Sequence, residues 1–151
     1  MAPKKNFTVR IGFSLFLLVF FPLGNVNAED VMTPILTHVD EILKDNPEKP
    51  GEKIQMIRIV QDENLSMFVV RQAVGFLVKP HYHKSHAESV YVIKGTAQML
   101  VNGNWVDIKP GSIHFNPPGK VYSVRNTGNE PLVIMSLFTP ALKEPDRHFT
   151  E

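Results

Sequence analysis

The sequence predicts an all-β protein folded as a closed barrel or jelly roll, preceded by one short helix. Short segments rich in β-branched and aromatic residues recur between residues 53 and 137, and turn signals separate them every eight to twelve residues or so. Asn102-Gly103, between two of these segments, is the dipeptide typical of a type I′ β-hairpin. A chain of 151 residues with 43% hydrophobic and 21% charged residues has the size and composition of one globular domain with a sizeable core.

The first 28 residues have the three parts of a secretory signal peptide. A basic segment extends to Arg10, an apolar run follows at residues 11–23, and small residues up to Ala28 provide a cleavage site. The apolar run is shorter than the ~20 residues that a membrane span needs, which disfavours the alternative of an uncleaved anchor. We therefore expect an exported protein, periplasmic or secreted, whose mature chain begins at Glu29.

One short helix is expected at residues 33–45, within the segment 29–50 that precedes the barrel. Thr33 can cap this helix, and Pro34 suits its first position. Its apolar residues recur at helical spacing and are Ile35, Leu36, Val39, Ile42 and Leu43. We expect the helix to pack on the outside of the barrel.

Strands are expected throughout residues 51–138. They lie at residues 53–60, 65–73, 76–83, 88–94, 96–101, 105–108, 113–116, 121–125 and 132–137. The first strand is apolar on both faces, so it could be covered on both sides or lie at an interface. The segment 139–151, rich in proline and charge, is expected to lie along the surface or to be disordered.

Three side chains that can bind a metal, His81, His83 and Glu88, fall within eight positions. Residues two apart in a strand project from the same face, so His81 and His83 would lie together. The polar run that follows His83 can turn the chain and bring the strand of Glu88 back beside the first strand. Two imidazoles and one carboxylate arranged in this way form a metal site with open positions, although histidine pairs on strands are also often surface residues.

The spacing of these residues resembles the first motif of the cupin family, G(X)5HXH(X)3-4E(X)6G, over Gly75–Gly95. The second cupin motif, G(X)5PXG(X)2H(X)3N, is matched over Gly111–Asn126, except that Tyr122 replaces the histidine of the family. The resemblance covers about residues 51–137. It implies the cupin double-stranded β-helix, a jelly-roll barrel, and a homodimer in which pairing covers the apolar edge at residues 53–60.

The resemblance also implies one divalent transition metal per chain, with His81, His83 and Glu88 as its ligands. The absence of cysteine excludes thiolate ligands, but the ligand set does not choose among Fe, Zn, Mn, Ni and Cu. Tyr122 can bind the metal as a phenolate, stay protonated and hydrogen-bond a bound water or substrate, or only pack in the barrel. We favour the protonated role, because Glu88 already supplies one anionic ligand.

Two neighbouring groups of residues are further candidates for the pocket. His86, in the turn after the paired histidines, can bind the metal in place of Glu88, orient a ligand, or face water. Val90 and Val92 share a face with Glu88 in a strand, so we expect them to line the pocket.

His114 and Asn116 alternate along one strand just before the Pro117-Pro118-Gly119 turn. They share one face of that strand, so both enter the pocket if the face is interior and both are surface residues if it is exterior. In the first case His114 and Tyr122 are the candidate catalytic residues and Asn116 lines the pocket.

Two functions are compatible with these observations. One is an exported metal-dependent enzyme acting on a small molecule in the barrel pocket, and the resemblance implies dioxygenase, isomerase or lyase chemistry. The alternative is a non-catalytic module that binds a small ligand, a sugar or the metal itself. A net charge of +1 indicates neither nucleic acid nor an anionic membrane as a partner, and no stable membrane association is expected after signal cleavage.

Overall fold

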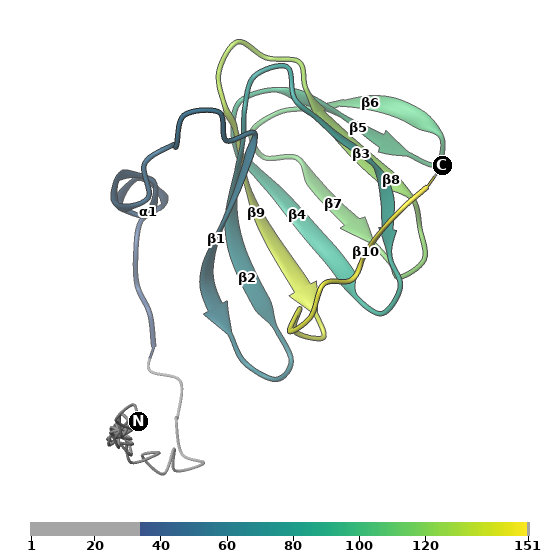
Figure 1. Cartoon of the computed structure of the whole chain (residues 1–151), viewed down its shortest axis with the longest axis horizontal. Helices are drawn as coiled ribbons and strands as arrows, with labels where there is room; N and C mark the ends of the chain where they lie inside the picture. Colours follow the sequence, from purple (N-terminus) through teal and green to yellow (C-terminus); the bar gives the residue numbers. More distant parts are fainter. Residues whose placement is uncertain (1–33, 151) are drawn as a thin grey trace, which may run out of the picture. The chain divides into compact units, whose positions relative to one another are not determined.

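The computed structural model describes residues 34–150 and shows two antiparallel sheets that form a barrel, with one short helix beside it (Figure 1). The predicted signal peptide lies outside the described residues. Within the described part of the chain, no helix is both long and apolar enough to cross a membrane. The prediction of an all-β jelly-roll barrel with a short N-terminal helix is confirmed.

Each sheet contains five strands. The first sheet is built, in spatial order, from β1 (Ile54–Gln61), β2 (Ser66–Gln72), β9 (Leu132–Thr139), β4 (Ala87–Lys94) and β7 (Ile113–Asn116). The second is built, in spatial order, from β10 (Arg147–Phe149), β3 (Leu77–His83), β8 (Tyr122–Asn126), β5 (Ala97–Val101) and β6 (Asn104–Ile108). All the strands expected from the sequence are present, each within two residues of its expected ends.

The hairpin between β5 and β6 has the expected turn. Asn102 and Gly103 both adopt positive φ angles, 50° and 81°, which a type I′ turn requires at its two central residues. Val101 and Asn104 therefore pair directly across the hairpin.

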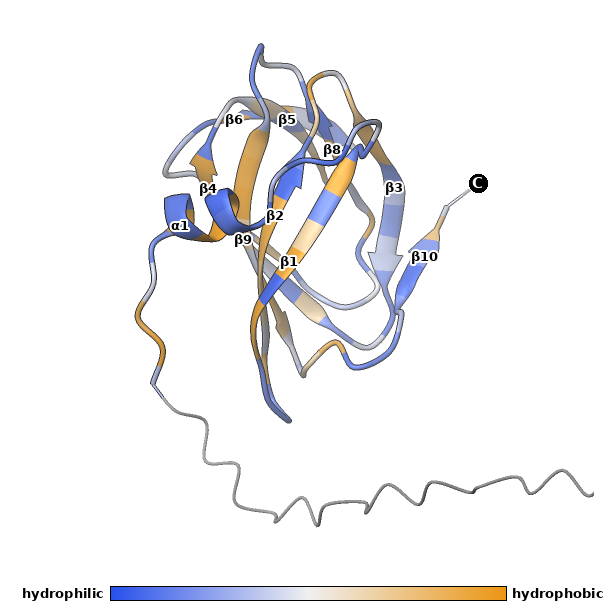
Figure 2. Ribbon diagram, turned by 60° about the vertical axis from the view of Figure 1, so that its left-hand side comes forward, coloured by the Kyte–Doolittle hydropathy of each residue, from blue (hydrophilic) through white to orange (hydrophobic). Residues whose placement is uncertain are grey.

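The core lies between the inner faces of the two sheets, where strands such as β4 bury alternate residues. Its apolar cluster consists of Phe68, Val70, Val90, Val92, Ala97, Met99, Val124, Leu132, Ile134 and Phe138. In Figure 2, β3 and β10 are coloured mostly hydrophilic, in contrast to this cluster. Buried polar side chains nevertheless come from both sheets, among them Glu88 and Ser136 from the first and His81 and His83 from the second.

Helix α1 (Val39–Asp45) is shorter than expected. The expected cap at Thr33 lies outside the described residues, and residues 34–38 are exposed and not helical. No residue of α1 is buried, because the helix is attached by polar contacts and not by an apolar stripe. Arg71 of β2 makes these contacts, donating from its Nη2 to the carbonyl oxygens of Leu43 and Asn46 at 3.2 and 2.8 Å.

The C-terminal segment departs most from expectation. Instead of a tail that only lies along the surface or is disordered, it adds strand β10 to the edge of the second sheet, where Arg147 pairs with His83 and Phe149 with His81. Asp146 fixes the start of this strand, because its carboxylate accepts hydrogen bonds from the backbone N–H groups of Lys84 and Ser85 at 3.1 and 2.9 Å.

Candidate metal site

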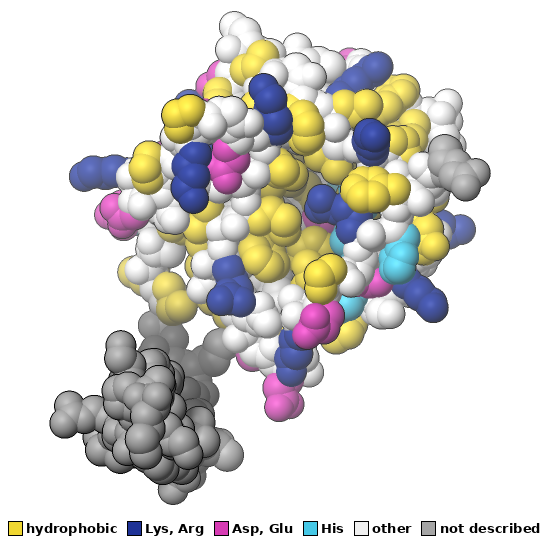
Figure 3. Space-filling view, viewed as in Figure 1, with side chains coloured by type: hydrophobic (Ala, Val, Ile, Leu, Met, Phe, Trp, Pro, Cys, Tyr) yellow, Lys and Arg dark blue, Asp and Glu magenta, His cyan; other side chains and the backbone are white. Residues whose placement is uncertain are grey.

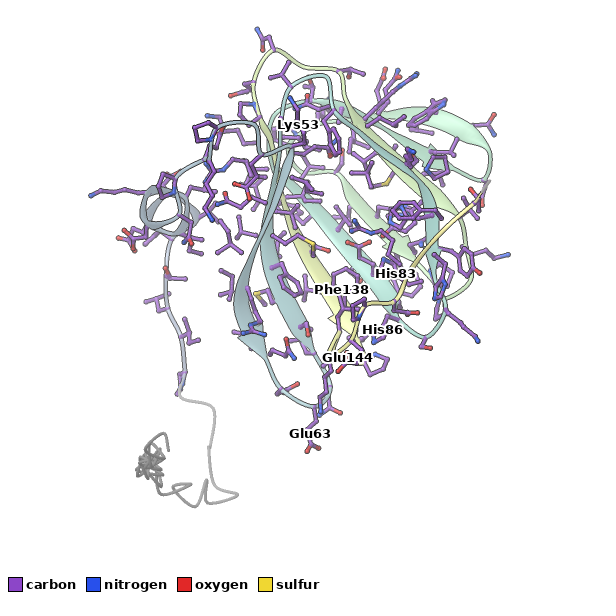
Figure 4. All side chains as sticks on the ribbon, in the orientation of Figure 1. Lys53, Glu63, His83, His86, Phe138 and Glu144 are labelled. Carbon is purple, nitrogen blue, oxygen red and sulfur yellow. The ribbon has the colours of Figure 1, made fainter. Side chains whose placement is uncertain are left out.

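Strands β3, β4 and β8 bring four predicted site residues together inside the barrel. His81 and His83 are 1% and 2% exposed, and Glu88 and Tyr122 are 7% and 4% exposed. His81 lies directly opposite Tyr122 in the antiparallel pair of β3 and β8, so the two side chains share the interior face. Figure 4 shows His83 and Phe138 between the sheets, with His86 and Glu144 nearer the lower end of the barrel.

A chain of hydrogen bonds joins three of these residues. The Tyr122 hydroxyl donates to Glu88 Oε2, and its oxygen lies 3.1 Å from His83 Nε2. Because the phenol has a single proton and gives it to Glu88, His83 is the donor in the second bond. Ser136 donates to the other carboxylate oxygen of Glu88. The result is a continuous path for a proton from His83 through Tyr122 to Glu88.

His81 presents an unpartnered nitrogen to the interior. Its Nδ1 donates to the carbonyl oxygen of Lys79 at 2.8 Å, whereas its buried Nε2 has no hydrogen-bond partner among the described residues. Burial, together with the positive charge of Arg147, lowers the pKa of His81 to about 4. The ring is therefore neutral at neutral pH, and the Nε2 lone pair is available to a ligand or an ion.

Burial sets the protonation of the other groups. It lowers the pKa of His83, with a further lowering from the charge of Arg147, and raises the pKa of Glu88 in spite of the hydrogen bonds from Ser136 and Tyr122. Burial and the neighbouring Glu88 carboxylate raise the pKa of Tyr122 well above its ordinary value of 10. The phenol of Tyr122 is therefore a proton donor at neutral pH.

The donor set fits a divalent transition metal in its chemistry. His83 Nδ1 is, like His81 Nε2, buried and without a partner among the described residues, and the Glu88 carboxylate lies close by. Yet His83 Nε2 and Glu88 Oε2 are 4.0 Å apart, with the Tyr122 hydroxyl bonded to both. Within residues 34–150, no three His, Cys, Asp or Glu residues are grouped closely enough to hold an ion.

An internal cavity of about 40 Å³ lies beside this cluster. Its lining consists of Ile54, Met56, Val70, Gln72, Val78, His81, Glu88, Val90, Tyr122, Val124, Ile134 and Arg147. The space holds only a few atoms, because one water needs ~10–15 Å³ on a comparable measure. Of the expected lining residues, Val90 does line the cavity, whereas Val92 packs into the apolar core and Asn116 lies elsewhere.

His114 and Asn116 lie on the interior face of β7. They pair across the strands with Val90 and Glu88, whose side chains are buried inward. The His114 ring centroid is 6.1 Å from that of Tyr122, and its buried Nε2 has no partner among the described residues. Asn116 instead donates to the carbonyl oxygen of Lys120 at 3.0 Å, so of the two only His114 has an uncommitted buried polar atom.

His86 serves the C-terminal segment. Its Nδ1 lies 2.5 Å from Asp146 Oδ2, and its Nε2 lies 3.2 Å from the carbonyl oxygen of Ala141. Both partners are hydrogen-bond acceptors, so neither ring nitrogen of His86 offers a lone pair to a metal. The contacts of His86 with Asp146 and Ala141 tether the C-terminal segment to the barrel, a role that the spacing of the motif did not indicate.

Arg147 is the functional candidate that sequence reasoning missed. It lies opposite the inward-facing His83 in the pair of β10 and β3, and its side chain lines the cavity. Its Nε is buried without a partner among the described residues. Alternation within residues 147–149 could have placed Arg147 and Phe149 on one face, but nothing local indicates that this segment is a strand or which strand it pairs with.

An open groove of about 470 Å³ lies outside the cavity and shares three lining residues with it, Ile54, Val78 and Arg147. The rest of its lining is Phe76, Leu77, Lys79, Phe149 and Thr150. Figure 3 shows hydrophobic side chains around a hollow on this face, with basic and histidine side chains beside it. Arg147 thus stands between a small inner cavity and a larger, mainly apolar outer groove.

Comparison with known proteins agrees with this architecture. The family model described as "Cupin domain" matches residues 68–138. An uncharacterized protein of Aquifex aeolicus (strain VF5) is 31% identical over 108 residues, which are 72% of this chain and 86% of that protein. A double-stranded beta-helix protein from Klebsiella pneumoniae subsp. pneumoniae MGH 78578 has a similar fold, with a TM-score of 0.66 at 23% identity over 79% of this chain and 99% of that one.

An enzyme is also among the relatives. The glucose-6-phosphate isomerase of Thermococcus onnurineus (strain NA1) is 36% identical over 70 residues, which are 42% of this chain. These residues are 37% of the length of the isomerase, so the similarity reaches only part of that enzyme.

Proposed function

Because the chain belongs to the cupin family through its domain at residues 68–138, we propose that it is a metal-dependent enzyme acting on a small molecule in the barrel cavity. The proposal rests above all on the buried chain from His83 through Tyr122 to Glu88, which lies beside the unpartnered Nε2 of His81. Uncommitted polar groups gathered in an otherwise apolar interior are typical of a reactive site. The similarity to an isomerase supports catalysis without fixing the reaction.

His81, His83 and Glu88 are the residues that would hold the metal. They offer two neutral imidazole nitrogens and one carboxylate, a set that suits Fe, Zn, Mn, Ni or Cu. Such an ion supplies Lewis acidity, which polarises a carbonyl or lowers the pKa of a bound group. Glu88 would exchange its hydrogen bond from Tyr122 for the ion, which frees the phenol to donate elsewhere.

Tyr122 and His114 would handle protons and orient the substrate. Tyr122 keeps its proton at neutral pH, so it acts as a hydrogen-bond donor or general acid toward a substrate oxygen. His114, whose pKa burial lowers, is neutral and can accept a proton at its unpartnered Nε2. Tyr122 lines the cavity and His114 lies next to it, with 6.1 Å between the ring centroids, so one group can give a proton and the other take one up.

A non-catalytic binding role is the second candidate. The observation that favours it is the small inner cavity, about 40 Å³ with a largely apolar lining, which holds a small group but little of a substrate. A binding module would retain its ligand unchanged, whereas an enzyme would convert it.

The test is metal analysis of protein from its own host, followed by turnover assays for sugar isomerisation, oxygen uptake and small-acid breakdown. We expect a divalent metal in near-equal amount to protein and a turnover that a chelator abolishes and the metal restores. Metal without any turnover would favour the binding module. Protein that holds no metal, even when it is supplied, would contradict the proposal.

We also propose export, on the basis of the N-terminal sequence up to Ala28. Mass spectrometry of the functional protein should find Glu29 at its N-terminus. Recovery of an intact N-terminus from the functional protein would contradict this.

A symmetric homodimer is a further proposal. β1 and β7 are the edges of the first sheet, and Met56 on β1 and Ile113 and Phe115 on β7 are 37%, 79% and 61% exposed. Pairing of two copies would cover such an apolar edge. Light scattering over a wide range of concentrations should give twice the chain mass, and a monomer throughout would contradict it.

A further inference from the structure

We propose that Arg147 is an anchor for a carboxylate, so that the ligand of this protein is a small organic acid with an apolar body. The inference deepens the proposed function, on which it rests, by naming the substrate class of the same cavity. It arises from the C-terminal strand, which lies outside both sequence motifs.

The position of Arg147 suits this role. It is held in β10 opposite His83, and its side chain lines both the inner cavity and the outer groove. A ligand that occupies both the groove and the cavity would therefore contact Arg147, with its inner end toward His81 and Tyr122. Arg147 can fix one end of such a ligand while the other parts lie in the two spaces.

Arg147 has no partner of its own among the described residues. Every ion pair found there joins other residues, and the buried Nε of Arg147 makes no hydrogen bond. Glu88, the carboxylate in the cavity lining, is already bonded by Tyr122 and Ser136. Arg147 is only partly buried, but its buried Nε has no hydrogen-bond partner among the described residues, and a bound anion would supply one.

The lining favours a carboxylate over a phosphate. Arg147 is the single permanent cation in the lining of the inner cavity and lies there with the Glu88 carboxylate, so the lining offers one cation to an incoming anion. A planar carboxylate also matches the fork of a guanidinium with two parallel hydrogen bonds. A phosphate dianion would need a second cation, and Lys79, the other basic residue of the groove, is exposed.

The outer groove indicates the rest of the ligand. Phe76, Leu77 and Phe149 give it an apolar surface, and its volume of about 470 Å³ is that of a typical small-molecule site. The inner cavity holds only a few atoms, so the group that enters it beyond the carboxylate is small. The fitting ligand is thus a monocarboxylic acid whose apolar part lies toward the groove.

Calorimetric titration with hexanoate, its neutral counterpart hexanamide, and inorganic phosphate tests this inference on the full chain. Hexanoate should bind the wild type more tightly than hexanamide or phosphate. Arg147→Gln should weaken hexanoate binding roughly tenfold to a hundredfold and leave hexanamide binding unchanged, because only a charge-assisted pair is lost. Arg147→Lys should retain part of the affinity. The control Lys143→Gln, at an exposed lysine that lines neither the cavity nor the groove, should retain nearly all of it.

A second measurement does not depend on a folded variant. In uniformly nitrogen-15-labelled wild type, the side-chain Nε–H resonance of Arg147 should shift on addition of hexanoate and stay in place with hexanamide. Equal binding of hexanoate and hexanamide, tighter binding of phosphate, no binding of hexanoate, or unchanged affinity in Arg147→Gln would each overturn the inference.

Both measurements are made with chelated and with metal-supplied protein. Arg147 is not among the residues proposed to hold the metal. The preference for hexanoate over hexanamide should therefore be measurable both in chelator-treated protein and in metal-supplied protein. Carboxylate binding without metal uptake would contradict the proposed function alone. Metal uptake without carboxylate selectivity would contradict the Arg147 inference alone.

Discussion

The cavity is walled by two regions that are held in place very differently. Strands β3, β4 and β8, of 7, 8 and 5 residues, carry His81, Glu88 and Tyr122 as buried side chains within the two sheets. The C-terminal segment carries Arg147 on a strand of only three residues, which is attached through Asp146 and His86. The proposed metal ligands thus belong to the buried interior of the barrel. Arg147, in contrast, is held at the cavity by a few polar contacts, so we expect that it can be displaced while the barrel stays folded.

The sharpest test of this contrast compares the metal content of two histidine variants. One removes a proposed metal ligand, and the other removes a histidine that attaches the C-terminal segment. His81→Ala should abolish metal binding, because it deletes a proposed ligand on the motif strand. His86→Ala should leave the metal nearly unchanged, because the ring of His86 contacts Asp146 and Ala141. Metal analysis by mass spectrometry checks both variants, and equal losses would contradict the assignment of the ligands.

Release of the C-terminal segment is the next largest effect. Asp146→Ala removes the acceptor for Lys84, Ser85, His86 and His148, and should lower the free energy of unfolding by about 2–3 kcal/mol. It should also weaken hexanoate binding as much as Arg147→Gln does, because β10 would no longer hold Arg147 at the cavity.

Urea unfolding and calorimetric titration measure these two effects. Glu144→Ala is the matched control, because this exposed carboxylate makes no ion pair or side-chain hydrogen bond within the described part of the chain. Asp146→Ala protein with wild-type hexanoate affinity would show that the tether does not position Arg147.

The same contrast explains what the sequence could predict. Strand periodicity placed His81 and His83 on one face, and the cupin resemblance pointed to Glu88 and Tyr122, because these relations are local or repeat at fixed spacing. All of these side chains lie in the interior. The alternation of His114 and Asn116 was also visible, but their common face became clear only from the pairing of β7 with β4.

The tail and the helix could not be predicted in the same way. Asp146 contacts Lys84, Ser85 and His86, which are 60 or more positions away in the sequence. A strand of three residues is too short to show a sequence pattern that would predict these contacts. The expected helix start relied on a cap and an apolar stripe, yet α1 buries no residue and is fixed by Arg71 from a distant strand. In helix α1 and in the C-terminal segment, polar contacts with residues distant in the sequence determine the structure. Local sequence patterns cannot predict such contacts.

Acid should also weaken the attachment of the C-terminal segment, at a pH below the ordinary pKa of Asp146. Burial alone would raise the pKa of Asp146, but hydrogen bonds from His86, Ser85, Lys84 and His148 outweigh it and hold the pKa below its ordinary value of 3.8. A carboxyl group with a depressed pKa in the folded state stabilises it above the ordinary pKa, and this stabilisation is lost as the pH falls toward the depressed value.

The difference in unfolding free energy between wild type and Asp146→Ala should therefore be constant from about pH 7 to pH 5 and shrink below about pH 4. Urea unfolding at pH 6 and at pH 3 measures this difference. A difference that is equally large at both values would show that the charge of Asp146 is not what holds the segment.

The smallest effect on metal content is expected at Tyr122, which lies on β8 in the first of the two regions. Tyr122→Phe removes only the oxygen that joins His83 and Glu88, and it leaves the ring that packs 4.4 Å from His81 between ring centroids. Because we assign Tyr122 a protonated role, metal content should be unchanged, and the loss of its hydrogen bonds should cost about 1–2 kcal/mol of stability. Turnover should fall.

The metal content of Tyr122→Phe separates three roles of the phenol. Loss of metal, or of a visible phenolate-to-iron absorption band, would show that Tyr122 is a ligand and that burial does not keep its proton in place. Unchanged metal and unchanged turnover would show that the ring only packs in the barrel. Hexanoate affinity should fall less in Tyr122→Phe than in Arg147→Gln in every case, because Arg147 is held by Asp146 and not by Tyr122.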